Sequence, residues 1–304
     1  MYSKIHLTFA LRQTLLVFEN SRDNNHKKMP SVFELEFTYY KDAKEKLNIT
    51  AVDTPQNLLD RSTFHEEWKT DLYLKDFYTK VEDSAMQMVL TFLPVVVQRI
   101  GPVKRVIDFG AGPTIHVSVC FRNTADELYL ADYLPQNRKA LQEWFDEKMD
   151  FDWSVPLKII DTREGGNWSN IKNMEPAARK KVKGIYHCDC FEDPAIKCSE
   201  DLQGTFNVLV TIFCVEYCCN TFDEYKASIK NMSRQIALGG YLVMGGVFEE
   251  TWCSFGGRNF TCLYITQEMM MEAFKEAGLS MENDKACVLY EVNGMYMVVA
   301  KKIE

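Results

Sequence analysis

The sequence lacks the features that direct a chain into a membrane or out of the cell. Its apolar segment 7–18 is interrupted by Arg12 and Gln13, and it is too short to span a bilayer. The segment also ends without the small residues of a secretory cleavage site. We therefore expect a cytoplasmic protein that has no membrane partner.

An excess of positive charge is missing as well. The 304 residues include 35 Lys and Arg against 43 Asp and Glu, which gives a formal net charge of −8 at pH 7. Nucleic-acid phosphates attract surfaces that are rich in Lys and Arg. The charge balance therefore argues against a nucleic-acid partner, and it fits a small cationic ligand better.

Paired metal-binding cysteines are absent, although the chain has ten cysteines. Neither group of cysteines, at 188–198 or at 214–219, contains the paired Cys-x-x-Cys motifs that hold a structural zinc ion. Many of the ten lie in apolar runs, and no secretory signal precedes them. We therefore expect reduced, mostly buried thiols and no bound metal.

Strand and helix patterns alternate from residue 103 onward. The predicted strands are 103–109, 127–132, 157–160, 206–213, 241–248, 286–291 and 295–301, and the predicted helices are 114–122, 136–148, 222–237 and 267–277. The last two strands flank a Val-Asn-Gly turn and predict an antiparallel hairpin. The pattern predicts an α/β fold with a doubly wound, mostly parallel, seven-stranded sheet and an antiparallel C-terminal edge. Its ligand crevice should lie beyond the carboxyl ends of the strands.

A glycine loop follows the first predicted strand at residues 108–114, Asp-Phe-Gly-Ala-Gly-Pro-Thr. Glycines at such a turn let the backbone approach a ligand closely. The second predicted strand ends in Asp132, 20 residues after Gly112, where a carboxylate can accept the hydroxyls of an adenosine ribose. Together these features predict a nucleoside cofactor.

The residue that follows this loop separates two cofactor classes. The dinucleotide fingerprint has a third glycine at the position of Ile115. A loop without that glycine is usual for S-adenosylmethionine, so the motif favours a methyltransferase. A NAD-dependent oxidoreductase remains an alternative, and so does a binding protein without catalytic activity.

The order of several motifs resembles the small-molecule methyltransferases that include nicotinamide, phenylethanolamine and indolethylamine N-methyltransferases. The motifs that carry this resemblance lie at 73–78, 108–114, 132–137, 151–154, 188–189, 213–216, 239–240, 249–252 and 298–302. The resemblance implies a Rossmann-like, S-adenosylmethionine-dependent N-methyltransferase that uses no metal. It would act as a monomer on a small-molecule amine or on nicotinamide.

The residue pattern, together with the resemblance, suggests how the chain is organised, although residues 1 to about 60 lie outside the resemblance. Residues 1–30, which include a polar stretch without periodicity, are expected to be a disordered or loose extension. Residues 31–100 would form an N-terminal helical cap and lid, with a helix predicted over 81–97. Residues 101–304 would form the catalytic core that binds S-adenosylmethionine.

The resemblance implies a set of cofactor-binding residues. They are Tyr73, Tyr78, Gly110, Ala111, Thr114, His116, Asp132, Tyr133, Asn137, Asp189, Cys190 and Ile212. Tyr73 and Tyr78 would close over the methionine end, and Asp132 would hold the ribose. Ala111 and His116 depart from the family, which usually has Ser and Tyr at these positions.

On the acceptor side, the resemblance implies that Phe213, Glu216, Glu249 and Glu291 bind the substrate. An ammonium ion must lose a proton before its nitrogen can attack a methyl group, so Glu216 and Glu249 are the predicted catalytic residues. Phe213 would supply an aromatic wall. Nicotinamide-type members have an Asp where this chain has Gly246, which favours a phenylethanolamine- or indolethylamine-like amine, with nicotinamide as the alternative.

Overall fold

The computed structural model describes Pro55 and residues 57–304. The predicted extension at residues 1–30 lies outside the described residues, as do residues 31–54 and 56 of the predicted helical cap. Leu59 to Glu304 form one unit of the chain. Within the described residues, no helix combines the length and the apolar character needed to cross a bilayer.

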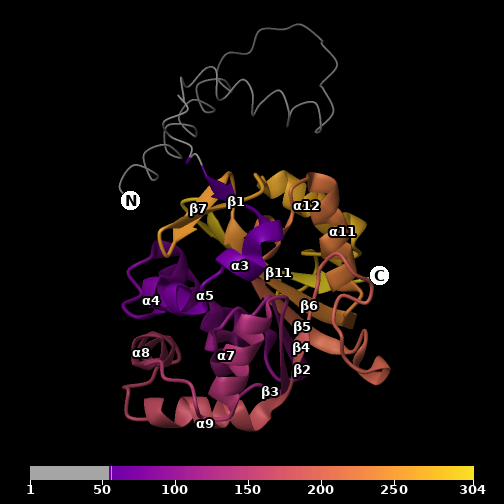
Figure 1. Cartoon of the computed structure of the whole chain (residues 1–304). Helices are drawn as coiled ribbons and strands as arrows, with labels where there is room; N and C mark the ends of the chain where they lie inside the picture. Colours follow the sequence, from indigo (N-terminus) through magenta and orange to yellow (C-terminus); the bar gives the residue numbers. More distant parts are fainter. Residues whose placement is uncertain (1–54, 56) are drawn as a thin grey trace, which may run out of the picture. The chain divides into compact units, whose positions relative to one another are not determined.

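Seven strands of the described part follow one another across a mixed sheet (Figure 1). Their order is β10 (Val288–Val292), β11 (Met295–Lys302), β6 (Ile236–Val247), β5 (Phe206–Ile212), β2 (Val103–Phe109), β3 (Ala125–Asp132) and β4 (Val182–His187). The pairs β2–β3, β2–β5, β3–β4 and β5–β6 are parallel, whereas β11 runs antiparallel to β6 and β10. A short strand, β9 (Leu279–Ser280), pairs with β11. The predicted fold class is therefore confirmed.

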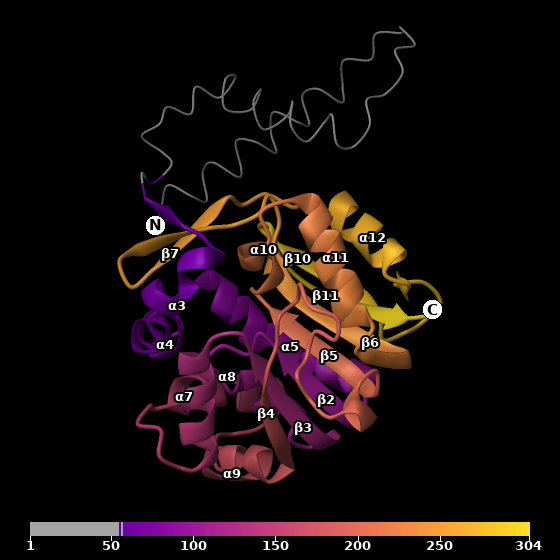
Figure 2. The same ribbon diagram turned by 45° about the vertical axis from the view of Figure 1, so that its right-hand side comes forward.

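Helices cover both faces of this sheet (Figure 2). The helices of the described residues are α3 (Phe64–Glu67), α4 (Thr70–Tyr78), α5 (Ser84–Ile100), α6 (His116–Phe121), α7 (Pro135–Phe145), α8 (Ser154–Arg163), α9 (Ile171–Lys181), α10 (Val215–Cys218), α11 (Phe222–Ser233) and α12 (Gln267–Glu276). Two 3-10 helices lie at Arg61–Thr63 and Glu200–Leu202, and β1 is Leu58–Leu59. α5 packs against α6 and α8, whereas α11 packs against α12.

The core has two layers because neighbouring residues of each strand point to opposite faces. Val106 and Val208 belong to the buried cluster that contains α5, α8 and α9 residues. Ile107 and Leu209, the next residues along, belong to the cluster that contains α11 and α12 residues. Strands covered on both faces read as continuous apolar runs, which is why these strands were visible in the sequence.

The strand predicted at 157–160 is wrong, because these residues lie in α8. The buried residues of α8 include Pro156, Leu157 and Ile160, a spacing that fits one face of a helix. The strand that follows β3 in the sheet is instead β4, directly after the basic end of α9. β4 lies at the edge of the sheet, and Val182 is its one buried residue. A strand that is mostly part-exposed needs no continuous apolar run, so its sequence does not resemble that of a buried strand.

A hairpin joins the N-terminal helices to the core. β7 (Trp252–Phe255) and β8 (Arg258–Thr261) turn at Gly256 and Gly257, which both have positive φ angles. The backbone N–H of Gly256 donates to Asp76 of α4 over 2.7 Å. The Phe255 ring stacks on the Phe260 ring with a centroid separation of 4.6 Å. These contacts hold α3 and α4 against the hairpin, where their aromatic residues cluster.

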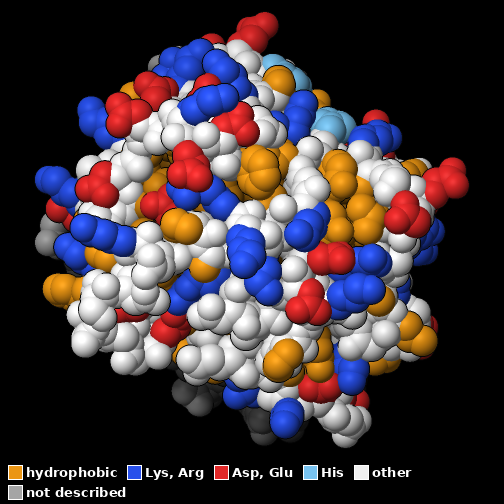
Figure 3. All heavy atoms as spheres, turned by 90° about the horizontal axis from the view of Figure 1, so that it is seen from below, with side chains coloured by type: hydrophobic (Ala, Val, Ile, Leu, Met, Phe, Trp, Pro, Cys, Tyr) orange, Lys and Arg blue, Asp and Glu red, His pale blue; other side chains and the backbone are white. Residues whose placement is uncertain are grey.

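Both signs of charge are mixed on the face seen from below in Figure 3. Lysine and arginine side chains lie among aspartate and glutamate side chains over most of this view, with small hydrophobic areas between them. This face therefore carries no broad patch of one sign.

Candidate active site

A cavity opens where β2, β3 and β5 end, the edge at which ligands bind in doubly wound sheets. The cavity is partly open to solvent, and the atom-free space in it and at its mouth, open solvent included, is about 920 Å³. The residues predicted to bind the cofactor all line it: Tyr73, Tyr78, Gly110, Ala111, Thr114, His116, Asp132, Tyr133, Asn137, Asp189, Cys190 and Ile212. Of the predicted acceptor-side residues, Phe213 lines the cavity.

The glycine loop is fixed by its own backbone. The N–H groups of Gly110 and Ala111 both donate to the carbonyl oxygen of Ala131, each over 2.9 Å. Gly110 has φ of +74°, and a side-chain carbon at this position would come within 2.3 Å of Cys214 Sγ. Only glycine fits here, because the loop packs directly against the start of α10.

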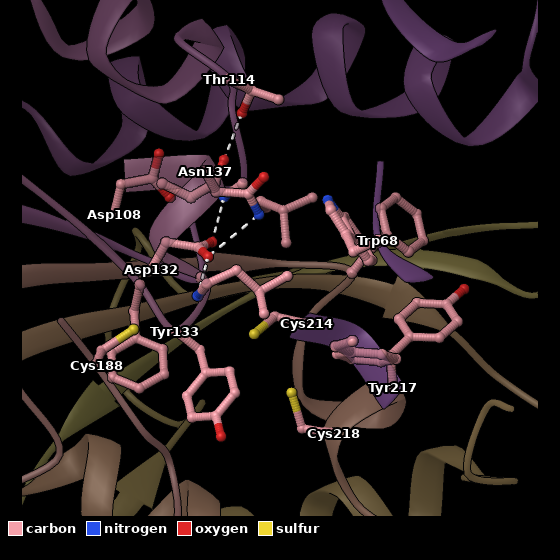
Figure 4. A pocket seen from close by; sticks show the side chains of 18 of the residues that line it. Trp68, Asp108, Thr114, Asp132, Tyr133, Asn137, Cys188, Cys214, Tyr217 and Cys218 are labelled. Carbon is pink, nitrogen blue, oxygen red and sulfur yellow. Dashed lines mark hydrogen bonds between the residues drawn. The ribbon is translucent and has the colours of Figure 1, made fainter. Parts of the chain in front are cut away.

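Asp132 connects the end of β3 to this loop (Figure 4). Its Oδ2 accepts from the Gly112 N–H over 2.7 Å, and its Oδ1 accepts from the Leu134 N–H over 2.8 Å and from Asn137 Nδ2 over 3.2 Å. Burial raises the pKa of Asp132, while these hydrogen bonds lower it. Since a carboxylate oxygen has two lone pairs, Oδ2 keeps acceptor capacity for a ligand hydroxyl.

Besides Trp68 Nε1, which is described below, two buried polar atoms in the cavity lining have no hydrogen-bond partner within the described residues. They are Asp108 Oδ2 and His116 Nε2, on side chains that are 3% and 4% exposed. Tyr78 Oη lies 3.3 Å from the other ring nitrogen of His116. Burial lowers the pKa of His116 to about 4, so its ring is neutral at pH 7. Burial, with a smaller contribution from Asp132, raises the pKa of Asp108 well above its usual range.

An aromatic wall forms the opposite side of the cavity from Asp108 and Asp132. Figure 4 shows Trp68 and Tyr217 on this side, and Phe64 and Tyr73 also line the cavity. The Trp68 ring lies 5.1 Å from the Tyr73 ring, and the buried Nε1 of Trp68 has no partner among the described residues. We define Phe64, Trp68, Tyr73 and Tyr217 as the aromatic wall.

The sequence reasoning missed several lining residues. Asp108 was visible as the acid that starts the glycine-loop motif, but it was not assigned to the site. Trp68 precedes the motif at 73–78 and carries no signal of its own. The same is true of Arg61, whose Nη2 lies 3.7 Å from Asp189 Oδ2 and whose guanidinium lies 3.8 Å from the centre of the Phe191 ring.

The three predicted acceptor-side glutamates lie outside the cavity lining. Cys214, Tyr217 and Cys218 of the α10 region line the cavity, whereas Glu216 is 3% exposed and lies against β6. A side-chain carbon at Gly246 would come within 2.7 Å of Glu216 Oε1. Burial raises the pKa of Glu216 to about 7.

The other two glutamates lie near the C-terminal edge of the sheet. Glu249 follows β6 with a positive φ of 57°, and its N–H donates to the Ile265 carbonyl oxygen over 2.9 Å. Glu291 is in β10, and its Oε1 accepts from the Gly294 N–H over 3.4 Å.

A doubly wound sheet, with a glycine loop after its first strand and an acid facing it from the next, defines the class of Rossmann-like proteins that bind a nucleoside cofactor. The model of the NNMT/PNMT/TEMT family matches residues 56–303, and the chain belongs to this family. It is therefore an S-adenosylmethionine-dependent N-methyltransferase.

Relatives in this family differ in the acceptor that their names state. Nicotinamide N-methyltransferase of Caenorhabditis elegans is 32% identical, over 78% of this chain and 90% of that protein. Human nicotinamide N-methyltransferase is 26% identical, over 65% of this chain and 76% of that protein. Human phenylethanolamine N-methyltransferase is 22% identical, over 66% of this chain and 74% of that protein.

Solved structures agree on the fold. The CurJ carbon methyltransferase is 12% identical, with a TM-score of 0.53 over 98% of this chain and 80% of that chain. The methyltransferase domain of the citrinin polyketide synthase is 15% identical, with a TM-score of 0.52 over 99% of this chain and 79% of that chain. At this identity the likeness concerns the fold alone.

Proposed function

We propose that this enzyme methylates the ring nitrogen of nicotinamide or of a similar pyridine carboxamide, with S-adenosylmethionine as co-substrate. The observation that carries the acceptor assignment is the buried Nε1–H of Trp68, which lacks a partner within an aromatic wall. A planar ring would lie against this wall, and its carboxamide oxygen would accept the indole hydrogen bond. The relative in Caenorhabditis elegans supports this choice.

The cavity lining fits S-adenosylmethionine on its other side. Asp132 Oδ2 would accept a ribose hydroxyl, since it already faces the glycine loop. If the Tyr78 hydroxyl donates to Nδ1 of the neutral His116 ring, Nε2 carries the proton and would donate to the methionine carboxylate. Asp108 Oδ2 would accept from the methionine ammonium.

The residues of the chain would then contribute to the reaction mainly by positioning the acceptor ring and the cofactor. S-adenosylmethionine, when bound, supplies a methyl group on a positively charged sulfur. The aromatic wall would hold the acceptor ring and exclude water, so that its nitrogen, the methyl carbon and the sulfur lie in line. A pyridine nitrogen has a free lone pair at pH 7 and needs no general base. This agrees with the placement of Asp108 and Asp132 opposite the wall.

An acceptor panel tests this proposal. Transfer of a tritiated methyl group to nicotinamide, phenylethanolamine, tryptamine and dopamine should give the highest kcat/KM for nicotinamide. Trp68→Phe keeps the ring but removes the N–H, so it should raise the KM for nicotinamide about tenfold, as expected for one lost buried hydrogen bond. Trp168→Phe is the matched control, because Trp168 is 53% exposed and lies outside the cavity lining. No transfer to nicotinamide would contradict the proposal.

A small amine is the second candidate, and the buried Glu216 favours it. A carboxyl group with a pKa of about 7 is well matched to accept a proton from an ammonium substrate near neutral pH. In this case Glu216→Gln should greatly reduce methylation of phenylethanolamine or tryptamine, and the residual activity should lose the acidic limb of the pH–rate profile, in which the rate falls below about pH 7 as the base is protonated. If nicotinamide is the acceptor, the same variant should keep its kcat within about twofold.

A further inference from the structure

Arg61 brings a positive charge to one end of the cavity from a segment far away in the sequence. It starts the 3-10 helix before α3, and its side chain, which is 29% exposed, lines the cavity. Its Nη2 lies 3.7 Å from Asp189 Oδ2. Its guanidinium carbon lies 3.8 Å from the centre of the Phe191 ring and 5.9 Å from the centre of the Tyr133 ring. The guanidinium is therefore close to three other residues of the cavity lining.

Local contacts fix the short helix that carries this side chain. Asp60 caps the helix, because its Oδ1 accepts from the Ser62 N–H over 2.9 Å. The Thr63 hydroxyl donates to the Asp60 carbonyl oxygen over 2.8 Å. The Thr261 hydroxyl of β8 donates to the Leu59 carbonyl oxygen over 3.4 Å. The segment before α3 is thus closed by its own side chains and tied to the β7–β8 hairpin.

The loop after β4 presents groups that match a planar cation. Asp189 Oδ1 accepts from the Phe191 N–H over 2.9 Å, so the loop itself orients the carboxylate, and Oδ2 lies beside Arg61. A guanidinium is planar and weakly hydrated, and it is attracted to an aromatic ring whose centre is within about 6 Å. The Phe191 and Tyr133 rings both meet this condition. Arg61 is therefore held as a flat cation in the cavity lining.

The contacts of the cofactor site indicate which part of the cofactor would lie at this end. Figure 4 shows Asp108 on one side of Asp132, and Tyr133 and Cys188 on the other. The adenine and the methionine chain of S-adenosylmethionine leave the ribose on opposite sides of its ring oxygen. With the ribose at Asp132 and the methionine ammonium at Asp108, the adenine would extend toward Tyr133 and the loop after β4. Arg61 lines the cavity at this end.

We propose that Arg61 binds the adenine of S-adenosylmethionine, with the plane of its guanidinium against the purine. The proposal rests on the cofactor site proposed above, and it adds to that site a residue of the segment before α3. Nucleobases stack on guanidinium planes as well as on aromatic rings. Because the ion pair with Asp189 already orients the guanidinium, less rotamer freedom is lost when the purine binds.

Three ligands test this contact in the full-length protein. Equilibrium dialysis measures the affinity for tritiated S-adenosylhomocysteine and its displacement by adenosine and by S-ribosylhomocysteine, which lacks the adenine. Arg61→Ala should weaken S-adenosylhomocysteine and adenosine about tenfold each, and should leave S-ribosylhomocysteine within about twofold of wild type. Arg61→Lys keeps the charge beside Asp189 but not the planar group, so it should still weaken the first two ligands about threefold. Equal losses for all three ligands, or no loss for S-adenosylhomocysteine, would overturn the proposal.

Arg258→Ala is the matched control. The Arg258 side chain is 30% exposed, and its Nε pairs with Glu67 Oε2 of α3 over 2.9 Å, outside the cavity lining. This variant removes an arginine that holds the same N-terminal part of the fold, and it should bind all three ligands as wild type does. A loss equal to that of Arg61→Ala would show that loosening of this part, and not a contact with adenine, weakens binding. That result would also overturn the proposal.

A trypsin footprint of the wild-type protein needs no variant. Trypsin cleaves after arginine, so saturating S-adenosylhomocysteine should slow cleavage between Arg61 and Ser62 about fivefold. Cleavage after Arg163, which is exposed at the end of α8 and lies outside the cavity lining, is the reference. Equal slowing at both bonds, or none between Arg61 and Ser62, would contradict the proposed contact.

These measurements separate the contact from the function proposed above. They use no methyl acceptor, so a failure to methylate nicotinamide leaves their outcome unchanged. If the wild-type protein does not bind S-adenosylhomocysteine, the cofactor site itself is contradicted, and the role of Arg61 with it. If the wild-type protein binds this ligand and Arg61→Ala binds it equally well, only the role of Arg61 is contradicted.

Discussion

Replacement of Glu216 by glutamine should change how the stability of the protein depends on pH. The Glu216 side chain is 3% exposed, and its Oε1 has no partner within the described part of the chain. Burial disfavours the charged carboxylate and raises its pKa from 4.5 to about 7. The folded state therefore binds a proton that the unfolded state releases between these two values.

The sign and the size follow from this shift. A raised pKa in the folded state contributes stability that is fully present below about pH 4.5 and is lost as the pH rises through about 7. With about 1.4 kcal/mol for each pKa unit, the whole effect is about 3 kcal/mol. Glutamine has a similar shape and does not titrate, so Glu216→Gln should remove this loss.

Urea denaturation of the ligand-free protein at pH 5.5, 7.0 and 8.5 measures the effect. Relative to wild type, the free energy of unfolding of Glu216→Gln should rise by about 2 kcal/mol between pH 5.5 and pH 8.5, since this range covers most of the titration. Asp108 and Asp132 also have raised pKa values, but they are common to both proteins and cancel in the difference. Glu268→Gln, at an exposed position of α12, should follow wild type. A difference between Glu216→Gln and wild type that stays constant across this pH range would refute the reasoning.

Three further predictions concern the cofactor side and the core. Asp132→Ala should weaken S-adenosylhomocysteine binding about 50-fold in calorimetry, because ribose contacts and the loop bond to Gly112 are both lost; unchanged affinity would exclude the proposed ribose contact. Gly110→Ala should lower the free energy of unfolding by about 2 kcal/mol, since the new methyl group meets Cys214 Sγ. Adding Cys214→Ala to this variant should restore part of the lost stability. If urea denaturation shows that Gly110→Ala is as stable as wild type, the close packing of the loop against Cys214 is contradicted. Glu164→Ala removes both hydrogen bonds to the buried Arg122 and should lower the free energy of unfolding by about 2 kcal/mol in the same assay. An unchanged free energy of unfolding would show that the ion pair is solvated and contributes no stability.

Local geometry made the cofactor side readable from the sequence. Positive φ angles at Gly110 and Gly112 need glycine, and Asp132 stands at a fixed place after a buried strand. In a parallel sheet, such strand ends meet at one edge, so the residues that follow them come together. This is why every predicted cofactor residue lies in the lining of one cavity.

The acceptor side depended on which way single side chains point. α10 covers only Val215–Cys218, and Tyr217 faces the cavity while Glu216 faces β6. A motif gives the position of a residue along the chain but not the face on which it lies in so short a helix. Edge strand β4 was missed for a related reason, because partial exposure removed the apolar run that marks a buried strand.

The sequence by itself determined the doubly wound sheet, the glycine loop and the acid that faces it, because these depend on backbone conformation and on the period of apolar residues. Only the tertiary structure decided that Trp68, in the cavity lining, has a buried N–H without a partner in the described part of the chain, and that Glu216 lies against β6. Such contacts join segments far apart in the chain, and they arise from how helices and loops pack against the sheet. No local pattern encodes that packing.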